Sequence, residues 1–245
     1  MRCLHEAKSS RHNCFITLTY SPDNVPLQGL RYRDFQLFSK RARKALGPFR
    51  FYMCGEYGEH LTHPHYHACL FGVDFPDRVH WSTGPSGFKL YRSSELERLW
   101  PSGFSSVGDV TFESAGYVAR YCVQKRLGDD AARYYGALTH PFNHMSLKPG
   151  IGQAFLDRFL GDIYPNDFVV VNGRPVKPPK FYDQKFREFH EESFEEIRFA
   201  RECRARERYL DNTDARLLVK EEVQRARVRS LSRGNVNDFE AGLHV

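Results

Sequence analysis

The sequence lacks several features that would assign it to a familiar class. None of its six cysteines forms a CxxC pair, and several lie inside apolar runs. This pattern predicts reduced, buried thiols in a cytosolic protein and argues against a disulfide framework or a structural zinc site. There is no signal peptide and no apolar run of roughly 18 residues, so neither secretion nor a membrane span is predicted. Clear internal repeats are also absent.

Aromatic residues and positive charge are what the sequence has in quantity. The 245 residues include 20 Phe and 13 Tyr, a composition typical of a globular protein. The net charge is +6 and the pI about 9.0, which weakly favours a polyanionic partner. A chain of this length can bury a real core, so we expect one principal domain with extensions.

The first half of the chain reads as strands interrupted by one amphipathic helix. The predicted strands are residues 13–20, 49–58 and 65–72, and the last two form a hairpin with a polar loop between them. Residues 31–46 predict a helix with Phe35, Phe38, Ala42 and Leu46 on its buried face. Gly47 and Pro48 end that helix.

The second half of the chain predicts further helices and one clear turn. We expect a short helix over 92–99, a strand over 103–112, a helix over 114–127, a loop over 143–152 that leads into a short helix, and one long helix or a helical pair over 183–230. Ser114 is the expected N-cap and Gly128 the expected stop of the helix over 114–127. Asn172-Gly173 between apolar runs predicts a hairpin turn.

His65 and His67 are the first candidate site. Side chains two apart on a strand point the same way, so both imidazoles can share one metal ion. Glu56 lies near the end of the preceding strand and reaches the same ion if the two strands pair, with Glu59 as the competing acidic ligand. Mixed nitrogen and oxygen ligands suit Mn²⁺ or Mg²⁺, although imidazole also suits zinc. The alternative is a half-exposed strand with incidental histidines, as we interpret His60 and His63 in the loop.

Tyr117, Tyr121 and Lys125 are the second candidate site. Their spacing of i, i+4, i+8 places all three on one face of a helix. A phenol with a pKa of about 10 is a poor nucleophile at neutral pH, but a neighbouring cation stabilises the phenolate. This face therefore has the groups needed to attack a phosphodiester. The alternative is an ordinary helix whose apolar residues pack in the core.

Basic side chains form the third candidate site. From Arg31 to Arg50 the chain has seven Lys or Arg and one Asp. Such a helix can contact phosphates, or it can be a solvated surface. The candidate DNA-binding residues are Arg31, Arg33, Lys40, Arg41, Arg43, Lys44 and Arg120. The charged C-terminal region adds arginines that could touch DNA, although such a region is most often a salt-bridged, solvated helix.

Three segments in this order resemble the motifs of the HUH endonuclease superfamily of rolling-circle replication initiators. FITLTY resembles motif I, HYH the metal-binding motif II, and YVARYCVQK the two-tyrosine nucleophile motif III. The segments CFITLTYSPDNVP, GEYGEHLTHPHYHACLFG, VGDVTFESAGYVARYC, MSLKPGIG and YPNDFVVVNGRPVKPPKFYD are similar to the initiators of the gokushovirus group of Microviridae. The resemblance covers residues 1 to about 182.

Two departures from the gokushovirus pattern stand out. Related chains often begin with a further cysteine-containing segment, so we expect this chain to be shortened, with Cys3 as a remnant. Members of the group also more often have Arg in place of Leu147 or Lys148, a difference that leaves the catalytic residues untouched.

The resemblance implies an α+β fold with a central, mainly antiparallel sheet, flanking helices and a helical C-terminal extension. It implies a catalytic core over 1–128, a loop, short helix and hairpin over 129–182, and a charged helical region over 183–245. The implied cofactor is a divalent metal, Mg²⁺ or Mn²⁺, on Glu56, His65 and His67. The implied reaction is nicking and rejoining of single-stranded DNA at a phage origin through a phosphotyrosine on Tyr117 or Tyr121, with Lys125 stabilising the phosphate or phenolate.

The resemblance also implies partners and alternatives. Single-stranded origin DNA, a host helicase and a host polymerase are the expected partners, in the host cytoplasm and without a membrane. A plasmid-type initiator or relaxase would share the chemistry. The absence of a GxxxxGK[ST] motif argues against initiators with an attached helicase. A non-catalytic single-stranded DNA-binding protein and a zinc hydrolase that uses only the histidines are the alternatives from other classes.

Overall fold

The computed structural model describes residues 1–57, 63–84, 87–124 and 129–234, except for the side chains of residues 120–124, 130 and 228–234. The chain divides into two compact units. One comprises residues 1–83 and 88–155, and the other comprises residues 84–87 and 156–245.

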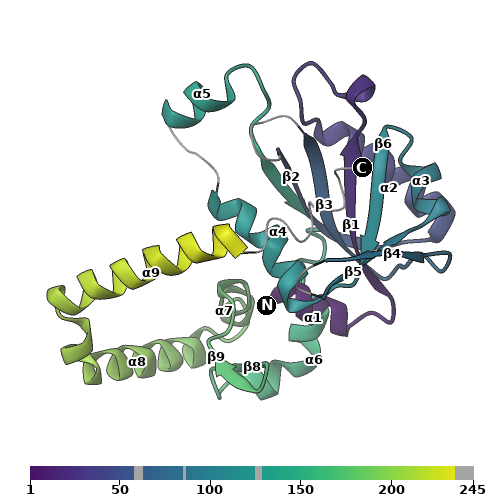
Figure 1. The fold of residues 1–245 in the computed structure, drawn as a ribbon. Coiled ribbons are helices and arrows are strands. Elements are labelled where there is room, and N and C mark those ends of the chain that lie inside the picture. The colour runs from purple at the N-terminus through teal and green to yellow at the C-terminus, as the bar shows by residue number, and fades with distance from the viewer. Residues whose placement is uncertain (58–62, 85–86, 125–128, 235–245) are drawn as a thin grey trace. The chain divides into compact units, whose positions relative to one another are not determined.

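The first unit mixes strands and helices along the chain (Figure 1). Its elements are α1 (Arg2–Lys8), β1 (Asn13–Tyr20), a 3-10 turn η1 (Pro22–Asn24), α2 (Tyr32–Leu46), β2 (Arg50–Tyr57), β3 (Pro64–Phe71), β4 (Val79–Thr83), β5 (Lys89–Arg92), α3 (Ser94–Leu99), β6 (Gly103–Gly108), α4 (Phe112–Gln124), α5 (Asp129–Tyr135) and β7 (Phe142–Met145).

These strands form one seven-stranded sheet in the order β4-β5-β6-β1-β3-β2-β7 (Figure 1). Every neighbouring pair is antiparallel, so the predicted α+β class with a mainly antiparallel sheet is confirmed. The histidine strand β3 lies between β1 and β2, and all of its residues are buried. A strand buried on both faces and along both edges has little freedom to shift its register.

The two faces of this sheet carry different side chains. On one face Ile16, Leu18 and Tyr66 pack in the main apolar core with Phe35 and Phe38 of α2. Because side chains alternate along a strand, the residues on either side of Tyr66, His65 and His67, point to the opposite face. Helix α4 packs on that opposite face, against β2 and β3. The predicted apolar face of α2 is therefore confirmed, and it lies across the sheet from the histidines.

Tyr66, the residue between the two histidines, ties β3 to the start of α2. Its hydroxyl accepts a hydrogen bond from the backbone N–H of Arg31 at 3.0 Å and lies 2.7 Å from the hydroxyl of Tyr20. Tyr20 in turn donates to Asp34 Oδ2 at 2.6 Å. Burial raises the pKa of Tyr66 to about 12, so its phenol stays neutral at physiological pH. This buried network fixes the height of the histidine strand relative to α2.

The start of α4 differs from the sequence-based prediction. The preceding strand β6 ends at Gly108 and α4 begins at Phe112, so Thr111, not Ser114, occupies the N-cap. The backbone N–H of Ser114 donates to Thr111 Oγ1 at 3.1 Å, and the N–H of Thr111 donates to Ser114 Oγ at 2.8 Å. This reciprocal pair is a capping box with a serine at its third helical position. Two hydroxyl residues three apart made the true cap hard to identify from sequence. Gly128, the predicted stop, lies outside the described residues.

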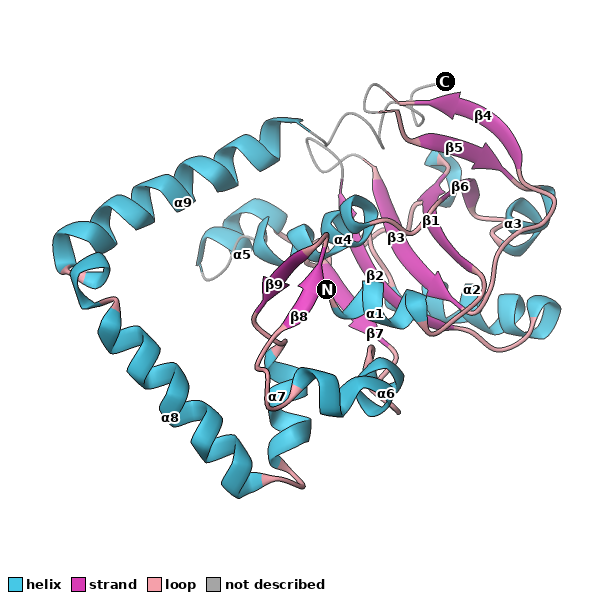
Figure 2. Ribbon diagram, turned by 90° about the horizontal axis from the view of Figure 1, so that it is seen from below, coloured by secondary structure: helices cyan, strands magenta, loops and turns pink. Residues whose placement is uncertain are grey.

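The second unit is mainly helical, with a separate two-stranded sheet (Figure 2). Its elements are α6 (Gln153–Ile163), which begins at the end of the first unit, β8 (Val169–Val171), β9 (Arg174–Val176), α7 (Lys180–Arg187), α8 (Glu191–Glu207), a 3-10 turn η3 (Tyr209–Asn212) and α9 (Asp214–Gly234). Asn172 and Gly173 have φ values of 50° and 74°, so the predicted hairpin turn is confirmed.

Several elements differ from the sequence-based expectations. The C-terminal region is helical as predicted, but it consists of three helices instead of one helix or a pair. α7 buries its own aromatic residues Tyr182 and Phe186, which sets it apart from the solvated α8 and α9. Residues 142–145 form the edge strand β7 where a loop was expected, because this short polar strand has no apolar alternation. None of the described helices combines the length and the apolar composition needed to cross a bilayer.

We predict that Tyr66→Phe destabilises the protein by about 1–3 kcal/mol, because it leaves buried polar groups of Arg31 and Tyr20 without their shared hydroxyl. Chemical denaturation followed by circular dichroism measures this change. Tyr209→Phe is the matched control, since Tyr209 is 69% exposed and surface changes usually stay within about 0.5 kcal/mol. Equal stability of the Tyr66→Phe variant and the wild type would contradict the anchoring role.

Candidate active site

The three predicted metal ligands meet on the face of the sheet that α4 covers. Glu56 of β2 is the direct cross-strand partner of His65 on β3, so the expected pairing is confirmed. The ligand atoms of Glu56, His65 and His67 all lie within 4.8 Å of one another. Glu56 Oε1 is 2.8 Å from His65 Nε2 and 3.0 Å from His67 Nε2. All three side chains are buried.

The hydrogen bonds of His65 show how a cation fits this cluster. Its Nδ1 lies 2.7 Å from the backbone oxygen of His63, which can only accept, so Nδ1 carries the proton. Its Nε2 faces Glu56 Oε1, and an ionised carboxylate also only accepts. The short contact therefore needs either a proton or a metal cation between the two atoms. A metal would take the lone pair of Nε2 while Nδ1–H keeps its bond to His63.

His67 is oriented in the same manner by a different residue. Thr17 on β1 is its cross-strand partner, and Thr17 Oγ1 lies 2.9 Å from His67 Nδ1. This contact leaves Nε2 turned toward Glu56. Burial lowers the pKa of His67, although the hydrogen bond with Glu56 acts in the opposite direction. The imidazole is therefore neutral near pH 7, the form that binds a metal.

The donor set fits a divalent cation. Two imidazole nitrogens and one carboxylate are found with Mn²⁺, Mg²⁺ or zinc, and such sites keep further positions for water or substrate oxygens. Glu56 Oε2 is buried and receives no hydrogen bond from any residue that the structure describes. A second carboxylate oxygen in this state is available to a cation. Glu59 and His60 lie outside the described residues, and His63 takes part through its carbonyl oxygen, not its ring.

Tyr117 of α4 lies directly over this cluster. Its side chain is 2% exposed. Its ring packs edge-on against the ring of His67, with centroids 4.9 Å apart, and against Phe15 at 6.4 Å. The structure thus brings the predicted nucleophile to the predicted metal ligands. Tyr121 and Arg120 lie on the backbone of α4, but their side chains are outside the described part, as is the whole of Lys125.

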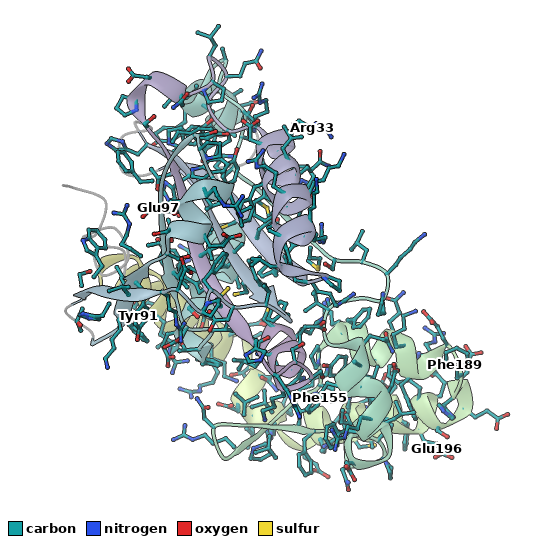
Figure 3. The ribbon with its side chains drawn as sticks, turned by 90° about the vertical axis from the view of Figure 1, so that its right-hand side faces the viewer. Arg33, Tyr91, Glu97, Phe155, Phe189 and Glu196 are labelled. Carbon is teal, nitrogen blue, oxygen red and sulfur yellow. The ribbon has the colours of Figure 1, made fainter. Side chains whose placement is uncertain are left out.

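The basic helix α2 lies on the opposite face of the sheet from Tyr117 and the metal ligands. Arg33, Lys40 and Lys44 are exposed, and Figure 3 shows Arg33 on α2. DNA that contacts both α2 and the histidine site must pass around an edge of the sheet.

Other arginines of α2 bind neighbouring protein groups. Arg31 forms an ion pair with Asp34 at 2.7 Å. Arg41 donates to the backbone oxygen of Leu99 at 3.0 Å. Arg43 donates to the backbone oxygen of Phe49 at 3.2 Å and stacks on its ring. Their role in DNA binding remains a prediction.

Arginines of α8 in the second unit are also engaged by protein groups. Arg201 pairs with Asp167 at 2.5 Å and with Asp183 at 2.8 Å, and Arg204 pairs with Asp167 at 2.6 Å. These ion pairs join α7 and α8 to the segment before β8. We infer that Arg201 and Arg204 stabilise this unit.

Thr17 is the site residue that sequence reasoning missed. FITLTY was assigned to a strand, but the strand that pairs with His67 could not be identified from sequence alone. The only available signal was the period of two, which puts Thr17 and Thr19 on one face of β1. Nothing in the pattern indicated that β1 is the neighbour of β3.

We predict that Thr17→Val weakens Mn²⁺ binding about 10- to 100-fold, because it removes the hydroxyl that orients His67. Calorimetric titration of the protein with MnCl₂ measures the effect. Thr139→Val makes the same exchange at an exposed position and should leave the affinity unchanged. Equal losses in both variants would show that Thr17 has no special role.

Mn²⁺ affinity should fall as the pH is lowered, because protons compete with the metal for the imidazoles. Since burial lowers the pKa of His67, this histidine should keep its metal-binding form below its usual pKa of about 6.5. The same titration between pH 8 and pH 5 tests this, with circular dichroism as the control for folding. An affinity that does not change over this range would exclude histidine ligation.

Comparison with known proteins places part of this chain in a family. Residues 13–126 match the family described as replication-associated protein ORF2. The chain is 30% identical to replication-associated protein VP4 of Bdellovibrio phage phiMH2K, over 80% of this chain and 64% of that protein. It is 29% identical to replication-associated protein ORF2 of Spiroplasma virus 4, over 79% of this chain and 64% of that protein.

A third relative is replication-associated protein ORF4 of Chlamydia phage 1, at 26% identity over 78% of this chain and 50% of that protein. The chain thus spans less than two thirds of these relatives. No solved structure matches it. The matched segment contains Glu56, both histidines of β3 and the tyrosines of α4, and residues 13–126 belong to the replication-associated protein ORF2 family.

Proposed function

We propose that this chain nicks and rejoins single-stranded DNA at a phage replication origin, and thereby starts and ends rolling-circle replication. The observation that carries the proposal is the position of Tyr117, whose ring lies 4.9 Å from that of His67 in the Glu56-His65-His67 cluster. The names of the phage relatives, all replication-associated proteins, support the biological role.

The reaction needs a nucleophile held beside a phosphate. The hydroxyl of Tyr117 loses its proton, and its oxygen forms a bond to phosphorus while the bond from phosphorus to the 3′ oxygen breaks. The 3′ oxygen takes up a proton and becomes the free 3′-OH that a polymerase can extend. A divalent cation, Mg²⁺ or Mn²⁺, bound by Glu56, His65 and His67 would polarise the scissile phosphate.

A second tyrosine on the same helix allows the strand to be closed. Tyr121 follows Tyr117 by one helical turn, so both side chains project from one side of α4. One tyrosine can hold the 5′ phosphate while the other attacks the regenerated origin. The released 3′-OH then attacks the first phosphotyrosine and yields a circular strand. Lys125 is the proposed cation that stabilises the phosphate or the phenolate.

The proposed partners follow from the activities that this chemistry leaves to other proteins. Unwinding and synthesis would come from a helicase and a polymerase of the host, in the host cytoplasm. The proposed DNA-contacting residues are Arg31, Arg33, Lys40, Arg41, Arg43, Lys44 and Arg120.

We predict that the double variant Tyr117→Phe with Tyr121→Phe loses all covalent attachment to DNA but still binds it. The test uses oligonucleotides that tile the genome encoding this chain, incubated with MnCl₂, and detects adducts by denaturing gel and mass spectrometry. Tyr209→Phe, at an exposed position, is the control and should form adducts like the wild type. EDTA should abolish cleavage by the wild type.

Each alternative gives a different result in this experiment. An adduct that persists in the double variant would disprove attack by these tyrosines. Binding without cleavage at any metal concentration would indicate a non-catalytic DNA-binding protein. Cleavage without any adduct in the wild type would favour a hydrolase that uses the histidines alone.

A further inference from the structure

One row of side chains crosses four neighbouring strands and leads outward from the histidine site. Glu56 on β2 pairs with His65 on β3, His65 pairs with Thr19 on β1, and Thr19 pairs with Phe104 on β6. Directly paired residues in antiparallel strands point to the same face of the sheet. Thr19 and Phe104 therefore stand on the same face as the metal ligands.

Phe104 is the exposed end of this row. Its side chain is 49% exposed, whereas Glu56, His65 and Thr19 are at most 5% exposed. Two strand spacings separate its backbone from that of His65, a distance of about 10 Å. α4 packs against β2 and β3, and the ring of Phe104 remains open to solvent two strands away.

The position of Phe104 is fixed by its neighbours. A Cβ atom on Gly103 would collide with the backbone of Thr19 and Ser21, so only glycine lets β6 begin this close to β1. The tight approach sets the register that puts Phe104 opposite Thr19.

Thr19 supplies a polar group between Phe104 and the histidines. Its Oγ1 is buried and has no hydrogen-bond partner within the described ranges of the chain. Its backbone oxygen already accepts from the indole N–H of Trp100 at 3.0 Å. A buried hydroxyl without a partner destabilises a protein unless a ligand satisfies it. The hydroxyl is therefore suited to a phosphate or sugar oxygen.

We propose that Phe104 stacks on a base of the DNA strand whose phosphate lies at Glu56, His65 and His67, and that Thr19 binds the backbone between them. This inference rests on the proposed function and adds the surface that positions the strand. Stacking on an aromatic ring is tolerant of sequence, since every base has a π-face. Thus Phe104 aligns the strand without selecting the origin.

The size of the exposed feature favours a base over a protein partner. A stable protein interface buries roughly 800 Å² on each side, whereas Phe104 offers a single ring. A lone exposed phenylalanine is ordinary on a protein surface. Its place in one row with a metal site and an unsatisfied buried hydroxyl is what points to a nucleotide.

The test compares two ligands, an oligothymidylate of about 20 nucleotides and an abasic oligomer with the same backbone. Fluorescence anisotropy with MnCl₂ present measures their affinities for the full chain. The wild type should prefer the oligothymidylate, and Phe104→Ala should weaken its binding about 5- to 100-fold while the abasic oligomer binds as before. Phe104→Trp should retain the preference and show fluorescence quenching on binding.

Phe189→Ala is the matched control, because Phe189 is 81% exposed and lies outside the row (Figure 3). It should keep the full preference for the oligothymidylate. Thr19→Val should weaken both oligomers equally, since the hydroxyl contacts the backbone. Unchanged base preference in Phe104→Ala, or an equal loss in Phe189→Ala, would overturn the stacking role.

The result is separable from the proposed function. If the wild type forms the Tyr117 adduct but Phe104→Ala keeps its base preference, only the stacking inference fails. If the wild type forms no adduct, the nicking proposal fails whatever Phe104 does.

Discussion

The burial of β3 between β1 and β2 is the constraint on which the site depends. Pairing on both edges satisfies the backbone of this strand, and cover on both faces leaves it no solvent-exposed side. In that position a shift by one residue would put Tyr66 on the histidine side and the histidines in the apolar core. The cost of burying imidazoles without their partners there is what maintains the register.

The same strand thus serves two purposes through its alternation. Tyr66 and Ala68 face α2 and complete the core, while His65 and His67 face α4. Each histidine has an acceptor or hydroxyl behind it, from the carbonyl of His63 or the side chain of Thr17. This support orients both Nε2 atoms toward Glu56 before any metal arrives, which lowers the cost of binding.

Much of this arrangement was predictable because it is local. The histidines two apart, Glu56 on the preceding strand and the hairpin between them need only strand periodicity and pairing of successive strands. The turn at Asn172-Gly173 and the apolar face of α2 were predictable for the same reason. The start of α4 was misplaced because two hydroxyl residues compete for the cap, and β7 was missed because a short edge strand need not alternate.

Residue types and their spacing were determined by the sequence itself: two imidazoles on one strand face, tyrosines one helical turn apart and a helix rich in basic residues. Only the tertiary structure decided what each of these meets. It inserted β1 between β3 and β6, which brought Thr17 behind His67 and aligned Thr19 and Phe104 with the site. It also placed α2 on the far face from α4. The physical reason is that strand order and register come from long-range pairing and core burial, which a local pattern does not specify.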